Sequence, residues 1–364
     1  MKRIFKQNHK PIKFKFRQSK EDFIVTEIPE SEASSDKGNY LLAKVQKQNM
    51  STLEMLEFLE NELQCFNIGY AGLKDKHATT TQYITLPLKF SKSFEKLHHP
   101  RLKVLESSRT KQKLSIGDLK GNNFFIRLHE VSQEAADNLA IVLSEIQRQG
   151  MPNYFGYQRF GKDSSNFEKA KEVAQGERMM KDKKIERMML HAYQSYLFND
   201  WLAKRIEISK EIECKACEEL LVNMNLSQEA CDLLKNQGGL IKVLPGDIVY
   251  VHKTKKWENV SDLQAIRKPF KEQKVVPTGL LPGAKAWRAK AMAGEIEHHY
   301  DDLTVSAVGA RREAIVYPKA IRHEYKAKDK TFELSFTLPK GAYATVLLEN
   351  LANRDLTPEF KLKS

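Results

Sequence analysis

Residues 69–83 hold the side chains of this chain whose types and order best fit chemistry. Here Asp75 lies between Lys74 and Lys76, and His77 follows. Nearby positive charge favours the ionised form of an acid, so Asp75 is predicted to be a carboxylate. Such a carboxylate can act as a nucleophile or as a base on an electrophilic carbon. The same residues also fit a solvated Lys-Asp-Lys turn, which turn statistics favour when the loop is taken alone.

Arg17 is a candidate partner for this aspartate. It ends a predicted strand over residues 12–17 in which cationic and apolar side chains alternate. A guanidinium can hold a carboxylate through a bidentate, charge-assisted pair, so Arg17 can position Asp75. The alternative is that Arg17 faces water together with Lys13 and Lys15.

Asn122 and Phe124 are candidates for binding a base. They follow Gly121 at the start of a predicted strand. An aromatic ring beside an amide suits a flipped base, because the ring stacks and the amide holds an edge. Phe124 and Phe125 point to opposite faces of a strand, so one of them is predicted to be a core residue under either interpretation.

Residues 152–161 combine four aromatic side chains, one arginine and two glycines. That composition fits a stacking surface for RNA, and it fits a buried aromatic hinge between domains equally well. The candidate RNA-contacting residues of the chain are Lys74, Lys76, His77, Tyr154, Phe155, Gln158 and Arg159.

The composition favours a globular protein that binds nucleic acid. A length of 364 residues predicts about two domains. Sixty Lys and Arg residues against 47 Asp and Glu give a net charge of +13, and the basic residues are spread along the chain. Such a distribution attracts phosphate backbones better than it anchors a membrane, although a basic protein without such a partner remains the alternative. No apolar segment is long enough for a membrane span or a secretory signal, so a cytoplasmic protein is expected.

Neither a metal nor a cofactor is expected. Cys214 and Cys217 form a CxxC motif without a second pair, and with Leu221 and Met224 they have the spacing of a helix core rather than of a zinc site. The chain contains no P-loop, GxGxxG, HExxH or GxSxG motif. A metal-dependent nuclease is disfavoured because no second carboxylate lies at ligand spacing near Asp75.

Hydrophobic periodicity predicts an α+β chain. Strands are predicted over 12–17, 23–28, 40–45, 81–86, 102–106, 124–128 and 331–337, and helices over 51–63, 133–149, 184–207 and 303–313, with a last helix after 341. The strands are grouped by hairpins and do not alternate with helices as in a βαβ fold. A helix-rich texture begins near residue 160, which predicts an α+β body with a long insertion, closed by the last strand.

Three segments resemble the signatures of the TruD family of tRNA pseudouridine synthases. They are AGLKDKHATTTQ (71–82), GNNF (121–124) and PNYFGYQRFG (152–161). Further similar segments follow in order, namely DFIVTEIP (22–29), SYLFNDWLAKR (195–205), PTGLLPGAK (277–285), GARREAIVYP (309–318) and LPKGAYAT (338–345). The resemblance therefore covers nearly the whole chain.

The resemblance implies an isomerase that converts uridine to pseudouridine in tRNA, typically at position 13 of the D arm, without a cofactor. It implies a catalytic domain over residues 1–152 and 317–364, built on a mixed, largely antiparallel sheet with helices. A family-specific α+β insertion, in contact with RNA, is implied over 153–316. No membrane and no obligatory protein partner are implied.

The resemblance also implies roles for single residues. Asp75 matches the family's catalytic aspartate, and Asn122 and Phe124 match its N-x-F pair, of which Phe124 would stack on the target base. Arg17 stands where the family usually has lysine, so a positioning role fits it better than proton transfer. Whether Asp75 engages C1′, C6 or a ribose proton stays open, and an RNA-binding or RNA-chaperone protein without turnover is the alternative function.

Overall fold

The computed structural model describes residues 3–5, 9–30, 37–160, 166–224 and 226–356. The chain forms two compact units. We call residues 12–143 and 318–341 the sheet unit, and residues 1–11, 144–317 and 342–364 the helical unit. The functional division into a catalytic domain and an RNA-contacting insertion stays a prediction.

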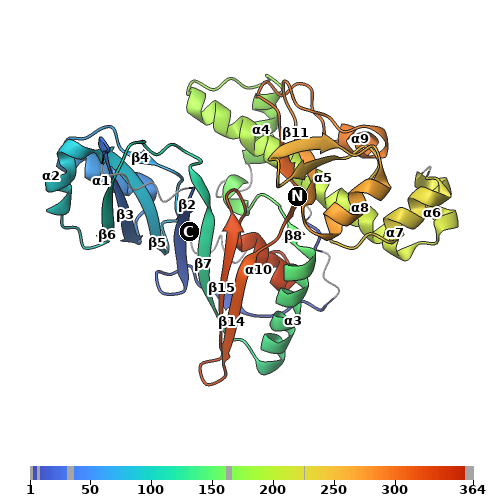
Figure 1. Cartoon of the computed structure of the whole chain (residues 1–364), viewed down its shortest axis with the longest axis horizontal. Coiled ribbons are helices and arrows are strands. Elements are labelled where there is room, and N and C mark those ends of the chain that lie inside the picture. The colour runs from blue at the N-terminus through green and yellow to red at the C-terminus, as the bar shows by residue number, and fades with distance from the viewer. Residues whose placement is uncertain (1–2, 6–8, 31–36, 161–165, 225, 357–364) are drawn as a thin grey trace. The chain divides into compact units, whose positions relative to one another are not determined.

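The sheet unit is built on one nine-stranded sheet. Its strands are β1 (Lys15–Phe16), β2 (Phe23–Pro29), β3 (Tyr40–Gln48), β4 (Gly69–Tyr70), β5 (Thr79–Pro87), β6 (Leu102–Thr110), β7 (Leu119–His129), β14 (Lys319–Lys326) and β15 (Thr331–Pro339). The order along the sheet is β14-β15-β7-β2-β5-β3-β6 (Figure 1). β1 pairs with β7, and β4 pairs with β5. Only β2 and β5 pair in parallel among these described strands, so the mixed, largely antiparallel sheet is confirmed.

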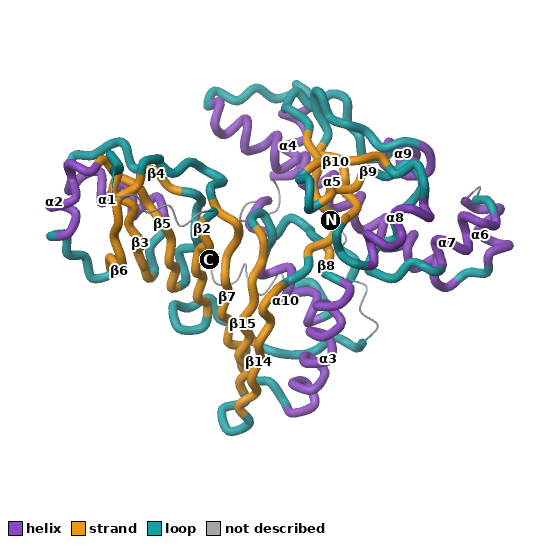
Figure 2. Tube along the Cα trace, viewed as in Figure 1, coloured by secondary structure: helices purple, strands orange, loops and turns teal. Residues whose placement is uncertain are grey.

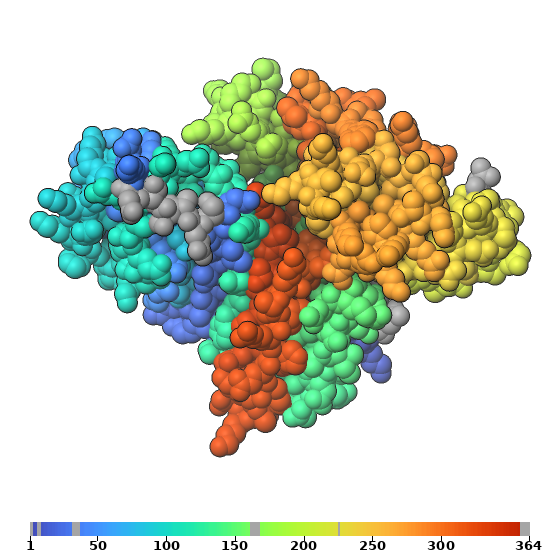
Figure 3. All heavy atoms as spheres, viewed as in Figure 1, coloured from blue at the N-terminus to red at the C-terminus, as the bar shows by residue number. Residues whose placement is uncertain are grey.

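Period-two patterning explains the strands of this sheet. In β3, buried and partly exposed residues alternate without a break, and the buried face carries Leu41, Ala43 and Val45. The last strand predicted from the sequence is present as β15, which pairs with β7 and completes the sheet. β14 and β15 form a hairpin, seen as an orange-red ridge in Figure 3.

Three helices accompany this sheet in the described ranges, namely α1 (Thr52–Leu63), α2 (Ser91–Glu95) and α3 (Gln133–Gln149), the last of which runs on into the helical unit. α1 is the helix predicted over 51–63, and it begins at a capping box, since Ser51 and Glu54 each accept a hydrogen bond from the other's backbone N–H. Its apolar side packs against β3 and β5 in one core that also includes Phe94. The N-terminus of α1 is thereby fixed over the sheet.

The helical unit combines seven helices with short strands among its described residues (Figure 2). The helices are α4 (Asn166–Ala174), α5 (Lys183–Cys214), α6 (Cys217–Met224), α7 (Gln228–Lys235), α8 (Leu263–Lys271), α9 (Ala291–His298) and α10 (Ala344–Ala352). The strands are β8 (Met151–Pro152), β9 (Ile248–Val251), β10 (Lys256–Asn259), β11 (Val275–Leu281), β12 (Ala310–Glu313) and β13 (Ile315–Val316). Within the residues that the structure describes, every helix is too short or too polar to cross a lipid bilayer.

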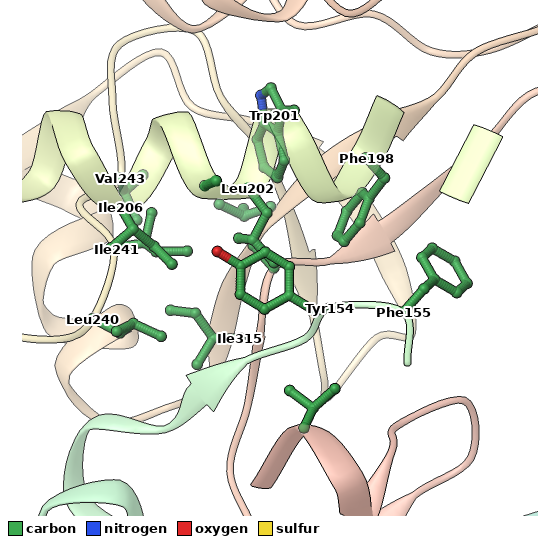
Figure 4. Packing of buried hydrophobic residues seen from close by; sticks show 14 of the residues in the cluster. Tyr154, Phe155, Phe198, Trp201, Leu202, Ile206, Leu240, Ile241, Val243 and Ile315 are labelled. Atoms are coloured by element: carbon green, nitrogen blue, oxygen red, sulfur yellow. The ribbon is translucent and has the colours of Figure 1, made fainter. Parts of the chain in front are cut away.

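The core of the helical unit is centred on α5. Trp201, Leu202 and Ile206 of this helix pack with Tyr154 and with residues that include Ile315 (Figure 4). β11 lies so close to α5 that Gly279 leaves no room for a side chain beneath the Trp201 ring.

Two sequence predictions in this unit were wrong. The helix predicted over 303–313 is absent, and β12 pairs there with β11. The β-branched residues Thr304, Val305 and Val308, followed by Gly309, disfavour a helix at this place.

The second error concerns the cysteines. Cys214 is exposed, and Cys217 forms a disulfide with Cys231 that joins α6 to α7. The helical spacing fails because Lys215 is extended and ends α5, so that Cys217 belongs to a new helix.

We expect Gly279→Ala to destabilise the packing of α5 on β11. A Cβ atom at this position would lie 2.3 Å from Cζ3 of the buried Trp201, and overpacking of this kind costs about 1–3 kcal/mol. Urea denaturation followed by tryptophan fluorescence measures the loss. Gly238→Ala is the control because nothing lies within 4 Å of its Cβ position, and equal effects of the two substitutions would contradict the close approach.

Candidate active site on the sheet unit

The register of the sheet places one line of residues across five strands. Lys47 lies opposite Thr80, Thr80 opposite Val25, Val25 opposite Phe124, and Phe124 opposite Phe336. Directly paired residues have side chains on the same face, so these five residues form what we call the site row. All five are buried. At about 4.8 Å between strands, Lys47 and Phe124 are separated by roughly 14 Å.

The loop that carries Asp75 is attached to the Lys47 end of this row. The backbone N–H of Lys74 donates to Thr52 Oγ1 over 2.9 Å, and Thr52 Oγ1 donates to Gln82 Oε1 over 2.9 Å. The ammonium of Lys47 donates to the backbone carbonyl of Asp75 over 3.2 Å. The loop is therefore held at two consecutive residues by side chains from α1, β3 and β5.

Lys74 forms a buried ion pair rather than an exposed cation. Its Nζ lies 2.5 Å from Glu27 Oε2, and both side chains are almost wholly buried. Glu27 also accepts a hydrogen bond from the backbone N–H of Tyr83 over 3.2 Å. Glu27 lies on β2, opposite Asn122 of β7. The ion pair therefore connects the Asp75 loop to β2, the strand beside β7. The prediction that Lys74 contacts RNA does not fit this burial, because its ammonium group is engaged inside the protein.

Desolvation is the largest influence on the pKa of Asp75. The residue is exposed, yet protein atoms around its carboxyl remove enough hydration to raise its pKa above the ordinary value. The positive charges of Lys47, then Lys74 and then His77 oppose this rise. The sequence prediction that neighbouring cations set its ionisation is therefore incomplete, and the strongest of these cations, Lys47, is not a sequence neighbour.

The N-x-F residues lie on the face of the sheet that carries this loop. The Phe124 ring stacks against Phe23 at 6.3 Å and against Phe336 at 5.3 Å between ring centroids, and the residue is 8% exposed. The adjacent Phe125 points to the other face and stacks with Arg127. Asn122 Oδ1 is buried without a hydrogen-bond partner among the described atoms, as are Thr80 Oγ1 and Gln82 Nε2. This face therefore has polar side-chain atoms that can still form hydrogen bonds, beside the stacked rings of Phe23, Phe124 and Phe336.

The other predicted residues of this unit lie at its surface. Arg17 is exposed, and within the described part of the chain its guanidinium forms no ion pair, so its hold on Asp75 stays a prediction. The loop after Arg17 does reach the start of β5, where Thr79 Oγ1 donates to the carbonyl of Lys20 over 2.7 Å. Lys76 pairs with Glu54 over 2.6 Å at the surface, and His77 is exposed.

The aromatic segment 152–161 belongs to the core of the helical unit. Tyr154 is fully buried, and its hydroxyl bonds both the N–H and the carbonyl of Ile4. Phe155 is buried beneath the Arg312 guanidinium, 4.0 Å from its ring centroid. Of the two alternatives open for this segment, the burial of Tyr154 and Phe155 fits a buried aromatic core and does not fit a stacking surface for RNA. Of the four candidates, only Gln158 is exposed, while Arg159 is partly exposed and donates to Ser195.

The described residues contain no group of three or more His, Cys, Asp or Glu side chains arranged to hold a metal ion. Sequence reasoning missed Lys47, Glu27, Thr52 and Gln82. The signal for Lys47, Glu27 and Gln82 is a charged or amide side chain on the otherwise apolar face of a strand, which becomes visible only once the register is known. Thr52, at the start of α1, gave no such signal.

Comparison with known proteins gives the family of this chain. The family model for tRNA pseudouridine synthase D (TruD) matches residues 2–179, 167–238 and 216–351. A tRNA pseudouridine synthase D of a Nitratiruptor species is 42% identical over 361 residues, which cover 99% of this chain and 100% of that protein. The chain belongs to the TruD family.

Other members of this family support the assignment. A tRNA pseudouridine synthase D of Wolinella succinogenes is 40% identical over 359 residues, which cover 98% of this chain and 99% of that protein. The crystal structure of a putative tRNA pseudouridine synthase D (TruD) from Methanosarcina mazei has a TM-score of 0.71 and 24% identity, covering 99% of this chain and 97% of its own. That likeness shows the fold. The resemblance read from the sequence and the α+β class are thereby confirmed.

We expect Glu27→Gln to destabilise the sheet unit strongly. The substitution leaves the buried ammonium of Lys74 without a counter-charge, and breaking a buried pair in this way costs about 3–5 kcal/mol. Urea denaturation followed by far-ultraviolet circular dichroism measures the free energy of unfolding. Glu106→Gln is the matched control, since its pair with Lys44 is exposed and should contribute less than about 1 kcal/mol. A loss for Glu27→Gln no larger than that of the control would show that this pair does not hold the loop.

Proposed function

We propose that this chain is a tRNA pseudouridine synthase that isomerises uridine at position 13 in the D arm of tRNA, with Asp75 as the catalytic residue. The observation that carries the proposal is the site row. It ties the Asp75 loop, through Lys47, to the face that presents Asn122 and Phe124. Membership of the TruD family supports the same reaction. We infer that the protein acts in the cytoplasm, on tRNA, without an obligatory protein partner.

The reaction is a rearrangement within one nucleotide. The bond between ribose C1′ and uracil N1 breaks, the uracil turns, a bond from C1′ to C5 forms, and the proton of C5 is lost while N1 gains one. Nothing is oxidised, and no group leaves the molecule. A carboxylate that attacks the nucleotide or removes a ribose proton is sufficient in principle, which fits a site whose reactive group is the exposed Asp75.

The face beside Asp75 offers what a flipped uridine needs. Taking a base out of a folded arm costs a few kcal/mol, which stacking and phosphate contacts must offset. Phe124 supplies an aromatic ring beside Asn122, whose Oδ1 has no partner among the described atoms and can accept a hydrogen bond from a uracil N–H. The exposed Lys76 and His77 beside Asp75 are candidates for the phosphate contacts.

An RNA-binding protein without turnover is the second candidate function. The charge of +13 and the aromatic face fit it as well. Only Asp75, and the Lys47 hydrogen bond to its carbonyl, distinguish the two functions. RNA binding alone does not require an aspartate whose backbone is fixed in this way.

We expect Asp75→Asn to abolish pseudouridine formation while tRNA binding is kept, because the amide has nearly the shape of the carboxylate but no charge. Purified protein is incubated with unmodified tRNA without metal or nucleotide, and pseudouridine is mapped by mass spectrometry. The wild type should form product at position 13. Wild-type protein that binds tRNA yet forms no product in a full tRNA set would establish the binding-only function.

We expect Phe124→Leu to lower turnover far more than tRNA affinity at moderate salt, because leucine fills similar space but offers no ring to the base. Phe336→Leu is the matched control, a neighbour in the site row that is 2% exposed. It should reduce stability with little effect on turnover. Equal effects of the two substitutions on turnover would make Phe124 a core residue only.

A further inference from the structure

Lys47 is the most unusual charged residue of the sheet unit. It lies near the end of β3, is 0% exposed, and belongs to none of the segments that carry the resemblance. Its ammonium donates to the carbonyl of Met50 over 2.6 Å and to the carbonyl of Asp75 over 3.2 Å. Buried lysines are rare, since an ammonium group loses much hydration free energy inside a protein.

The buried ammonium of Lys47 joins two segments of the chain through the carbonyls of Met50 and Asp75. Met50 lies in the link between β3 and α1, and Asp75 lies in the candidate catalytic loop. The same link contributes the N–H of Asn49, which donates to the carbonyl of Ala78 over 3.3 Å, shortly after Asp75 in the chain. Of the described side chains that bind this loop, Lys47 is the one whose bond reaches Asp75 itself.

The charge of Lys47 also acts on the Asp75 carboxyl. Among the cations around that carboxyl, Lys47 lowers its pKa most, although no ion pair joins the two groups within the described structure. Burial, aided by Lys74, lowers the pKa of Lys47 to about 8, while the charges of Asp75 and Glu54 oppose that shift. The charge on Lys47 is therefore present near neutral pH and is lost as the pH rises through about 8.

We propose that Lys47 is a positioning residue for the reaction, whose ammonium fixes the Asp75 backbone and keeps the Asp75 carboxyl ionised. This inference rests on the proposed function of the same site. Lys47 does not touch the substrate in this account. It acts through Asp75, by a hydrogen bond to its carbonyl and by charge.

The test compares Lys47→Met with Lys44→Met. Both residues lie on β3, but Lys44 is partly exposed and pairs with Glu106 at the surface, so its loss controls for removing one charge from the strand. We measure kcat and KM for pseudouridine formation on unmodified tRNA as functions of pH, together with the melting temperature. Lys47→Arg, which keeps a charge and donors, is the conservative variant.

For Lys47→Met we expect kcat to fall by about 10- to 100-fold with little change in KM, the range that a misplaced reacting group produces. The acid limb of its kcat profile should move to higher pH, because the carboxyl loses the cation that most lowers its pKa. The wild type should lose activity as the pH rises through about 8, and Lys47→Met should lack that limb. Lys47→Arg should recover part of kcat, and Lys44→Met should match the wild type.

Two results would overturn the inference while the wild type forms product. One is an unchanged kcat in Lys47→Met. The other is a lower kcat with an unshifted pH profile and a lower melting temperature, which would make Lys47 structural only. Absence of product from both the wild type and Lys44→Met would instead contradict the proposed function.

Discussion

A buried ammonium group must find oxygen atoms inside the protein, and the site of this chain depends on how two lysines meet that requirement. Lys47 takes the carbonyls of Met50 and Asp75, and Lys74 takes the carboxylate of Glu27. Each lysine connects the loop to a different strand, β3 in one case and β2 in the other. Leaving either charge unpaired costs several kcal/mol, so the loop has little freedom to leave the sheet.

The sheet is the frame on which the candidate catalytic and base-binding residues are arranged. The strand register sets the distance between Lys47, which holds the Asp75 carbonyl, and Phe124. Both residues belong to the site row, which crosses β3, β5, β2 and β7 between them. A reaction that must break one bond, turn a base and form another needs both ends of such a site. Under the proposed function, the loop holds the group that reacts, and Phe124, three strands away from Lys47, offers the ring against which the base stacks.

Sequence patterns within one segment predicted most helices and strands of this structure. The contacts between residues far apart in the chain depend on strand pairing, which these patterns do not specify. The helix predicted over 51–63 is present as α1, which the capping box of Ser51 and Glu54 starts, and the last predicted strand is present as β15. Lys47, by contrast, lies 28 residues from Asp75 in the chain, and only the strand register brings the two together. Tyr154 gave an ambiguous signal, because its ring suits a stacking surface or a core, and packing against α5 decided for the core.

The most direct test is the structure of the protein bound to a tRNA that carries 5-fluorouridine at position 13, whose C–F bond blocks loss of the C5 substituent. We predict that this nucleotide is flipped out, with its sugar or base against the Asp75 carboxyl and its ring against Phe124, while Lys47 still binds the Asp75 carbonyl. A nucleotide bound away from Asp75, or left stacked in the D arm, would contradict the account.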